Sequence, residues 1–171
     1  MRALGWLGSI WGIGGVIAIL GMAIGRMMPM AEEALAGPLG PMEWVAVAAS
    51  LVFFGYTEGY RAFQRQFSPR VVVRGLSLVE QPLLHRILFA PPFCMGFFGA
   101  TRKRMTVSWV LTAGLVILIL LVKQIPRPWR GIIDLGVVVA LGWGVVAIVA
   151  FWARALAGRP PQVPADLPPP S

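Results

Sequence analysis

The sequence predicts an all-α integral membrane protein, in which four transmembrane helices carry an amphipathic or re-entrant cytoplasmic loop between the second and third helices. Hydrophobic residues make up 57 % of the chain and charged residues 13 %, about half of the charged share of roughly 25 % in soluble domains. A soluble fold with so few charges would expose large apolar patches, so we expect this surface to face lipid. Eight of the fifteen basic residues lie between positions 56 and 104, with uncharged runs on both sides.

The first predicted span covers residues 3–25, which include no charged side chain. At about 1.5 Å per residue, a helix of this length crosses a hydrocarbon core of roughly 30 Å. We expect it to be retained rather than cleaved, because the apolar run is longer than that of a typical signal peptide. Small residues recur in it at helical spacing and predict close helix packing in lipid: Gly8, Gly12, Gly14, Ala18, Gly21 and Gly25.

The second predicted span covers residues 42–62 and follows Pro41, a residue that suits the first position of a helix. Its uncharged part has only 14 residues, Trp44 to Thr57, or about 21 Å of helix. We therefore place the Glu58 carboxylate at the hydrocarbon boundary or inside it. Arg61, three residues later, is the expected partner in an ion pair. Two small residues are expected to serve helix packing here: Gly55 and Gly59.

The predicted cytoplasmic loop contains an interfacial or re-entrant part, residues 70–100. We expect the preceding helix to end at Pro69, because a proline disfavours helical backbone in the residue before it. Residues 70–81 gather arginines on one side and aliphatic residues on the other, which predicts an amphipathic helix in the interface plane, with a short strand as the alternative. The apolar remainder is interrupted by Pro91-Pro92, and such short runs are typical of re-entrant or interfacial segments.

The third and fourth predicted spans cover residues 106–122 and 132–153. The third is almost wholly aliphatic and is expected to be the most lipid-exposed helix. Asp134 lies near the start of the fourth span, where the helix dipole stabilises a negative charge. Arg130 is its expected partner in an ion pair. Residues 1–157 thus form a single transmembrane domain. The fourth span carries a second seam of small residues expected to serve helix packing: Gly136, Ala140, Gly144 and Ala147.

The proline-rich tail, residues 158–171, is predicted to be disordered. With four spans, eleven basic residues lie on the side of both termini and the loop, and four on the other side. The positive-inside rule then places both termini in the cytoplasm. Thirteen of the fifteen basic residues are arginine, and alanine and glycine are abundant, a composition typical of a GC-rich bacterial genome. We therefore expect the protein in the inner membrane of a bacterium. Several basic residues are expected to bind anionic lipid headgroups: Arg65, Arg70, Arg74, Arg102, Lys103 and Arg104.

No motif in the chain points to catalysis, so we expect a protein that is not an enzyme. The residues show no phosphate-binding glycine loop, no nucleophile motif and no paired acids at a usable spacing. His85 is the only histidine and Cys94 the only cysteine, which excludes a zinc site or a bis-histidine haem built within one chain. His85 remains a weak candidate for binding a quinone head or a chlorin, and Cys94 is expected to be a small buried hydrophobe. We predict no cofactor or metal, but bound lipid.

These observations favour a small accessory, assembly or structural subunit of a larger membrane complex. Its expected partners are the bilayer and other membrane-protein subunits or a second copy of itself. Nucleic acid is not expected, although the net charge is +8, because the charges lie between hydrophobic runs. Two alternatives stay open: an oligomeric transporter of ions or small solutes that uses Glu58, and a protein that handles lipids or quinones.

Overall fold

The computed structural model describes residues 2–167 and confirms an all-helical chain, with no strand among these residues. Three helices are long and apolar enough to cross a membrane: α1, α6 and α7. The fourth crossing, at residues 42–62, stays a prediction. The elements are α1 (Arg2–Ala36), α2 (Pro41–Phe54), the π-helix η1 (Gly55–Phe67), α3 (Ser68–Glu80), α4 (Leu84–Leu88), α5 (Ala90–Met95), α6 (Arg102–Val122) and α7 (Trp129–Leu156).

α2, η1 and α3 follow one another without a break and form a single helical rod from Pro41 to Glu80. The expected stop at Pro69 is therefore wrong. Pro69 occupies the first turn of α3, at its junction with η1. The helical backbone continues through it, although proline supplies no N–H group for a helical hydrogen bond. Within η1 the hydrogen bonds reach one residue further than in an α-helix, as in the bond from the Ser68 N–H to the Phe63 carbonyl.

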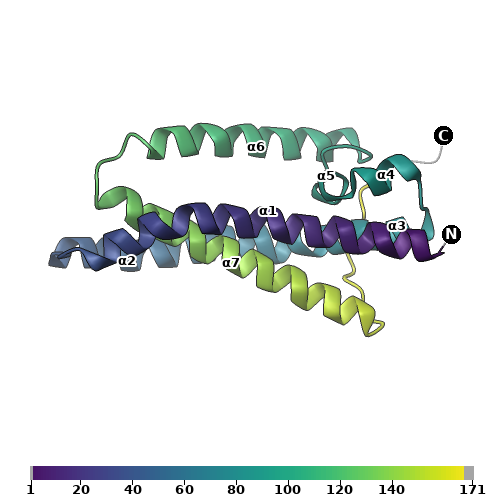
Figure 1. The fold of residues 1–171 in the computed structure, drawn as a ribbon, viewed down its shortest axis with the longest axis horizontal. Helices are drawn as coiled ribbons and strands as arrows, with labels where there is room; N and C mark the ends of the chain where they lie inside the picture. The colour runs from purple at the N-terminus through teal and green to yellow at the C-terminus, as the bar shows by residue number, and fades with distance from the viewer. Residues whose placement is uncertain (1, 168–171) are drawn as a thin grey trace.

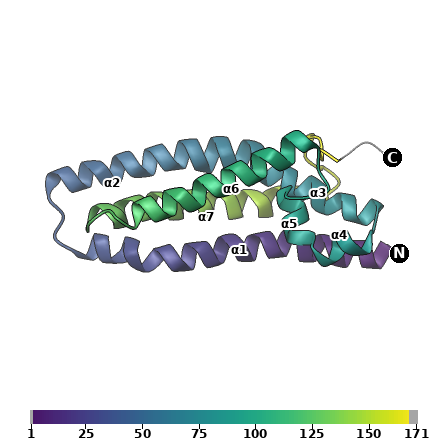
Figure 2. The same ribbon diagram turned by 90° about the horizontal axis from the view of Figure 1, so that it is seen from above.

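α1 and α7 run antiparallel and pack along much of their length, with the rod beside them (Figures 1 and 2). The N-terminal end of α1, the C-terminal end of α7 and the short helices α3 to α5 lie at the same end of the molecule, which we call the loop end. The turn between α6 and α7 lies at the other end, the turn end. There, Gly131 lies so close to α1 that a methyl group on it would meet Ala34.

The core at the loop end is built from α1, α3, α5 and α7. α3 is the helix predicted for residues 70–81, and it packs its apolar face on α1 and α7. Its place in the interface plane stays a prediction. The fully or almost fully buried apolar side chains are Ile13, Val16, Val71, Val72, Leu78, Phe93, Cys94 and Ile148.

α6 stands apart from the rest of the bundle (Figure 1). It is held mainly at its first two turns, where the Ser108 hydroxyl donates to the Met95 carbonyl at 3.1 Å and the Trp109 indole N–H donates to the Phe97 carbonyl at 3.3 Å. Further along, large apolar side chains such as Val110 and Ile117 are exposed. This exposure suits a helix surrounded by lipid.

Candidate functional site

The most unusual group in the structure is the guanidinium of Arg74, which is buried at the loop end with 1 % of the residue exposed. Its Nε donates to the Phe93 carbonyl at 2.6 Å, and its Nη1 donates to the Ala165 carbonyl at 2.9 Å. Its Nη2 donates to the carbonyls of Phe98 at 2.9 Å and Gly99 at 3.1 Å. Four of the five N–H groups of the guanidinium are thus used by backbone oxygens. Arg74 therefore ties together α3, the segment after α5 and the tail.

Three more arginines surround Arg74, and together with Asp166 we call these five residues the arginine cluster. The Nε of Arg70 lies 3.3 Å from the Oδ2 of Asp166, an ion-pair distance without hydrogen-bond alignment. The guanidinium of Arg86 lies 5.5 Å from the centre of the Phe93 ring. Arg104 feels the charges of both Arg70 and Asp166. The cluster holds four cations and one carboxylate, so its net charge is positive.

Burial lowers the pKa of Arg74 from 12.5 to about 10, because a charged group loses its hydration there. The neighbouring cations Arg104 and Arg86 lower it further, and Asp166 raises it. Arg74 stays protonated at neutral pH even so. The four carbonyl oxygens replace part of the lost hydration, and the face of the Phe93 ring, 4.2 Å away, adds a cation–π contact.

Cys94 lies next to this cluster and is 1 % exposed. Burial raises the pKa of its thiol to about 12, and the positive charge of Arg74 opposes part of that rise. Its Sγ packs against α1 so tightly that a methyl group at Gly12 would lie 2.8 Å from it. The thiol is therefore a neutral, inert core group, since the thiolate is the reactive form.

A turn of residues 96–99 connects the arginine cluster to the surface. Gly96 and Gly99 have φ angles of 85° and 58°, which side chains rarely allow. A methyl group at Gly96 would lie 3.3 Å from the Nε of Arg104, and one at Gly99 would lie 3.8 Å from the Nε of Arg86. Both guanidinium groups therefore pack on the same turn.

The outer side of this turn forms part of a groove of about 570 Å³ between α4, α5 and α6. We call it the aromatic groove. Its lining is almost entirely apolar and contains the only histidine of the chain. It is lined by His85, Phe89, Pro92, Phe97, Phe98, Trp109 and Thr112.

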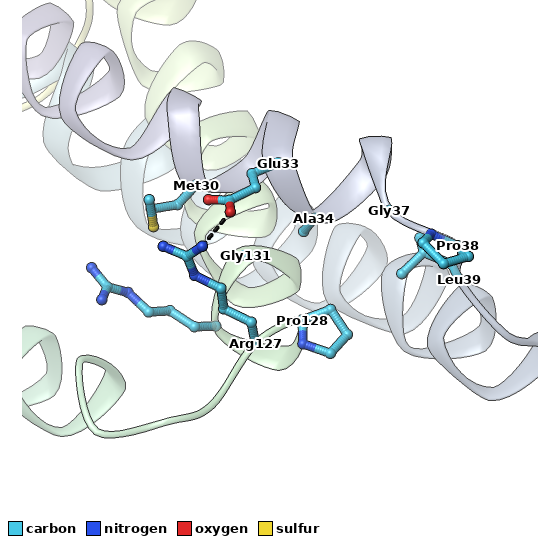
Figure 3. Close-up of a pocket in the computed structure, with 10 residues that line it drawn as sticks. Met30, Glu33, Ala34, Gly37, Pro38, Leu39, Arg127, Pro128 and Gly131 are labelled. Atoms are coloured by element: carbon cyan, nitrogen blue, oxygen red, sulfur yellow. Dashed lines mark hydrogen bonds and ion pairs between the residues drawn. The ribbon is translucent and has the colours of Figure 1, made fainter.

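A second, more polar pocket of about 290 Å³ lies at the turn end, between the C-terminal part of α1 and the start of α7 (Figure 3). Arg127 and Glu33 form an ion pair across its wall. Arg130, which also lines it, lies 3.7 Å from the Asp134 carboxylate, one helical turn away. Opposite charges thus meet in pairs at this end.

The structure does not bring the predicted pair Glu58 and Arg61 together. Both residues are exposed, and neither belongs to the three ion pairs found within residues 2–167. In a π-helix, residues four and five positions apart lie on the same face, so a spacing of three turns the two side chains away from each other. The stacked pair Tyr56 and Tyr60, four residues apart, follows this geometry.

The predicted packing glycines fall into two groups. A methyl group at Gly8, Gly12, Gly59, Gly136 or Gly144 would meet a neighbouring helix or segment at 3.3 Å or less. Ala140 and Ala147 are buried. By contrast, a methyl group at any of four other predicted glycines would find no atom within 4 Å, and Ala18 is exposed. These four glycines are Gly14, Gly21, Gly25 and Gly55.

The predicted headgroup residues are likewise divided. Arg65, Arg102 and Lys103 are exposed, whereas Arg70 and Arg104 are half-buried and Arg74 is buried. Sequence reasoning missed Arg86 and Asp166, which complete the cluster. Asp166 is the only acid of the tail, and this was the one signal that pointed to an ionic contact there. Among residues 2–167, no three His, Cys, Asp or Glu side chains lie close enough to hold a metal ion.

Comparisons with protein-family models, with curated proteins and with solved structures found no match to this chain. The functional argument therefore rests on the chemistry and packing of its own residues.

Proposed function

We propose that the protein is an accessory or assembly subunit, which binds a transmembrane helix of a partner protein on the exposed face of α1. This face carries Gly14, Ala18, Gly21 and Gly25, spaced four, three and four residues apart. We call these four residues the open seam. Such a seam lets two helix backbones approach closely in lipid, where dispersion and weak hydrogen bonds drive association.

The observation that carries the proposal is that the glycines of the open seam contact no other element among the residues and side chains that the structure describes. The space beside all three of these glycines is empty to 4 Å. A glycine inside a helix costs about 1 kcal/mol relative to alanine. α1 packs on its own α4 and α5 through other glycines, such as Gly8, Gly12 and Gly15. Packing against a partner helix would offset the helix-propensity cost of the three glycines in the open seam, Gly14, Gly21 and Gly25.

α6 supports the same role, because it offers a second apolar surface that the bundle leaves uncovered. We further propose that the loop end faces the cytoplasm of a bacterial cell. The N-terminal end of α1, the C-terminal end of α7 and the arginine cluster lie at the loop end, and this gathering of basic residues fits the positive-inside rule. A reporter enzyme fused after Ser171 should be active in the cytoplasm. Activity in the periplasm would contradict this orientation.

The test compares two glycine-to-leucine variants that are matched within the chain. Gly21→Leu fills the open seam, and Gly142→Leu fills an equally empty position on α7. At both positions the Cβ of the new side chain would meet no atom within 4 Å among the residues and side chains that the structure describes, so both variants should fold. We expect Gly21→Leu to reduce recovery of a stoichiometric partner in mild detergent about tenfold, because overpacking costs about 1–3 kcal/mol and about 1.4 kcal/mol corresponds to a factor of ten.

Gly142→Leu should recover the partner as the wild type does. Equal recovery with both variants would contradict the proposed seam. Purification of the wild type as a homodimer alone would contradict accessory function and favour the oligomeric transporter that uses Glu58.

A further inference from the structure

We propose that the loop end binds one anionic phospholipid, with its phosphate at Arg86 and Arg104 and an acyl chain in the aromatic groove. This site is distinct from the open seam and does not depend on the proposed partner. It goes beyond general attraction between basic residues and headgroups, because it places one lipid molecule between named side chains.

Two cations of the arginine cluster, Arg86 and Arg104, form no ion pair within residues 2–167. Arg74 is occupied by backbone carbonyls, and Arg70 lies beside Asp166. The Nε atoms of Arg86 and Arg104 are buried and have no hydrogen-bond partner within residues 2–167. Both residues are half-buried. A phosphate would bind these two cations from the solvent side, since guanidinium and phosphate form strong, charge-assisted hydrogen bonds.

The positions of the two guanidinium groups connect this charge to the groove. Arg86 and Arg104 both pack on the turn of residues 96–99, and the Phe97 and Phe98 side chains of the same turn line the aromatic groove. His85, the neighbour of Arg86 in α4, also lines it. A charged site and an apolar site therefore adjoin at one turn, as the two parts of a phospholipid do.

The groove itself favours a lipid over a free anion. Its lining is apolar and aromatic, and one wall is α6, a helix long and apolar enough to cross a membrane. Its volume of about 570 Å³ lies within the range of roughly 300–1,000 Å³ that is typical of ligand sites. Basic pockets beside transmembrane helices are a known setting for anionic lipids.

The experiment measures lipids retained by the purified full-length protein, using native mass spectrometry in detergent. The probes are phosphatidylglycerol and phosphatidylcholine with the same acyl chains. We expect one phosphatidylglycerol per chain, bound at least tenfold more tightly than phosphatidylcholine, since one charge-assisted hydrogen bond is worth about 1.5–3 kcal/mol. Equal retention of the two lipids would overturn the phosphate site.

Two double variants with the same loss of charge separate a site from general attraction. Arg86→Gln with Arg104→Gln should reduce phosphatidylglycerol retention at least tenfold. Arg61→Gln with Arg65→Gln removes two exposed cations of η1 outside the cluster and should leave retention within about twofold. An equal reduction in both pairs would overturn the proposal.

A third variant tests the groove and leaves every charge in place. Thr112→Trp fills the aromatic groove from α6, and it should reduce phosphatidylglycerol retention even if the arginine variants fail to fold. Unchanged retention in Thr112→Trp would overturn the placement of the acyl chain. Displacement of the lipid by millimolar inorganic phosphate would do the same, because it would show that the headgroup alone supplies the affinity.

Discussion

Arg74 and Phe93 contact each other twice: the Nε of Arg74 donates to the Phe93 carbonyl, and the guanidinium lies 4.2 Å from the centre of the Phe93 ring. One residue thus binds both the backbone and the side chain of the other. This double contact fixes α5 against α3 at the centre of the loop end. It also holds the turn that carries the aromatic groove.

The first prediction concerns this contact. Arg74→Met keeps the apolar stem but removes the guanidinium. The Phe93 carbonyl keeps its bond from the Gly96 N–H, whereas the carbonyls of Phe98, Gly99 and Ala165 lose their donor. We expect a loss of about 3 kcal/mol or more in the free energy of unfolding, because each unpaired buried group costs about 1–3 kcal/mol. Thermal unfolding in detergent measures the change. Arg65→Met, at an exposed position, should stay within about 0.5 kcal/mol of the wild type, and a similar loss in both variants would contradict the role of Arg74.

The second prediction compares two adjacent glycines of α1. A methyl group at Gly15 would lie 2.4 Å from the Pro91 ring, whereas one at Gly14 would meet nothing within 4 Å. Gly15→Ala should therefore destabilise the protein by about 1–3 kcal/mol through overpacking. Gly14→Ala should stabilise the isolated chain by up to about 1 kcal/mol through helix propensity. The two melting temperatures in detergent should move in opposite directions, and a shared direction would contradict the packing of α5 on α1.

The third prediction concerns pH and Cys94. The pKa of its thiol is about 12 in the folded protein, against 9.0 for an unperturbed thiol. Between these values the unfolded chain has lost this proton and the folded chain keeps it, so stability should fall as the pH rises from 9 to about 10. Above about pH 10 the lowered pKa of Arg74 adds a change of the opposite sign, because the folded chain then loses the Arg74 proton first. Cys94→Ala should flatten this dependence. Maleimide labelling at pH 8 should be slow in the folded protein and fast after unfolding in SDS, and fast labelling of the folded protein would contradict the burial of the thiol.

The three long helices could be predicted because each contains an uncharged run, and lipid requires little else of a spanning helix. Their ends were less predictable. α1 continues to Ala36, well past the expected end at Gly25, because the residues that follow include good helix formers such as Met, Ala and Glu. The rod was predicted in two pieces because Pro69 resembles a stop signal in the sequence.

The arginine cluster could not be assembled from the sequence. Arg74 shares a hydrogen bond with Ala165, 91 residues away, and no periodic pattern records such a contact. Residues 70–80 do form a helix with an apolar face, but the sequence does not show which groups cover its arginine side. Backbone carbonyls of the turn and of the tail cover it at Arg74, whereas the sequence suggested headgroups.

In the continuous rod from Pro41 to Glu80, the winding of η1 sets the angle at which α3 faces its neighbours relative to α2. Each residue of a π-helix turns the chain through a smaller angle than a residue of an α-helix, because its hydrogen bond reaches one position further. Rewinding part of η1 into an α-helix would rotate α3, with Arg74, about the axis of α2.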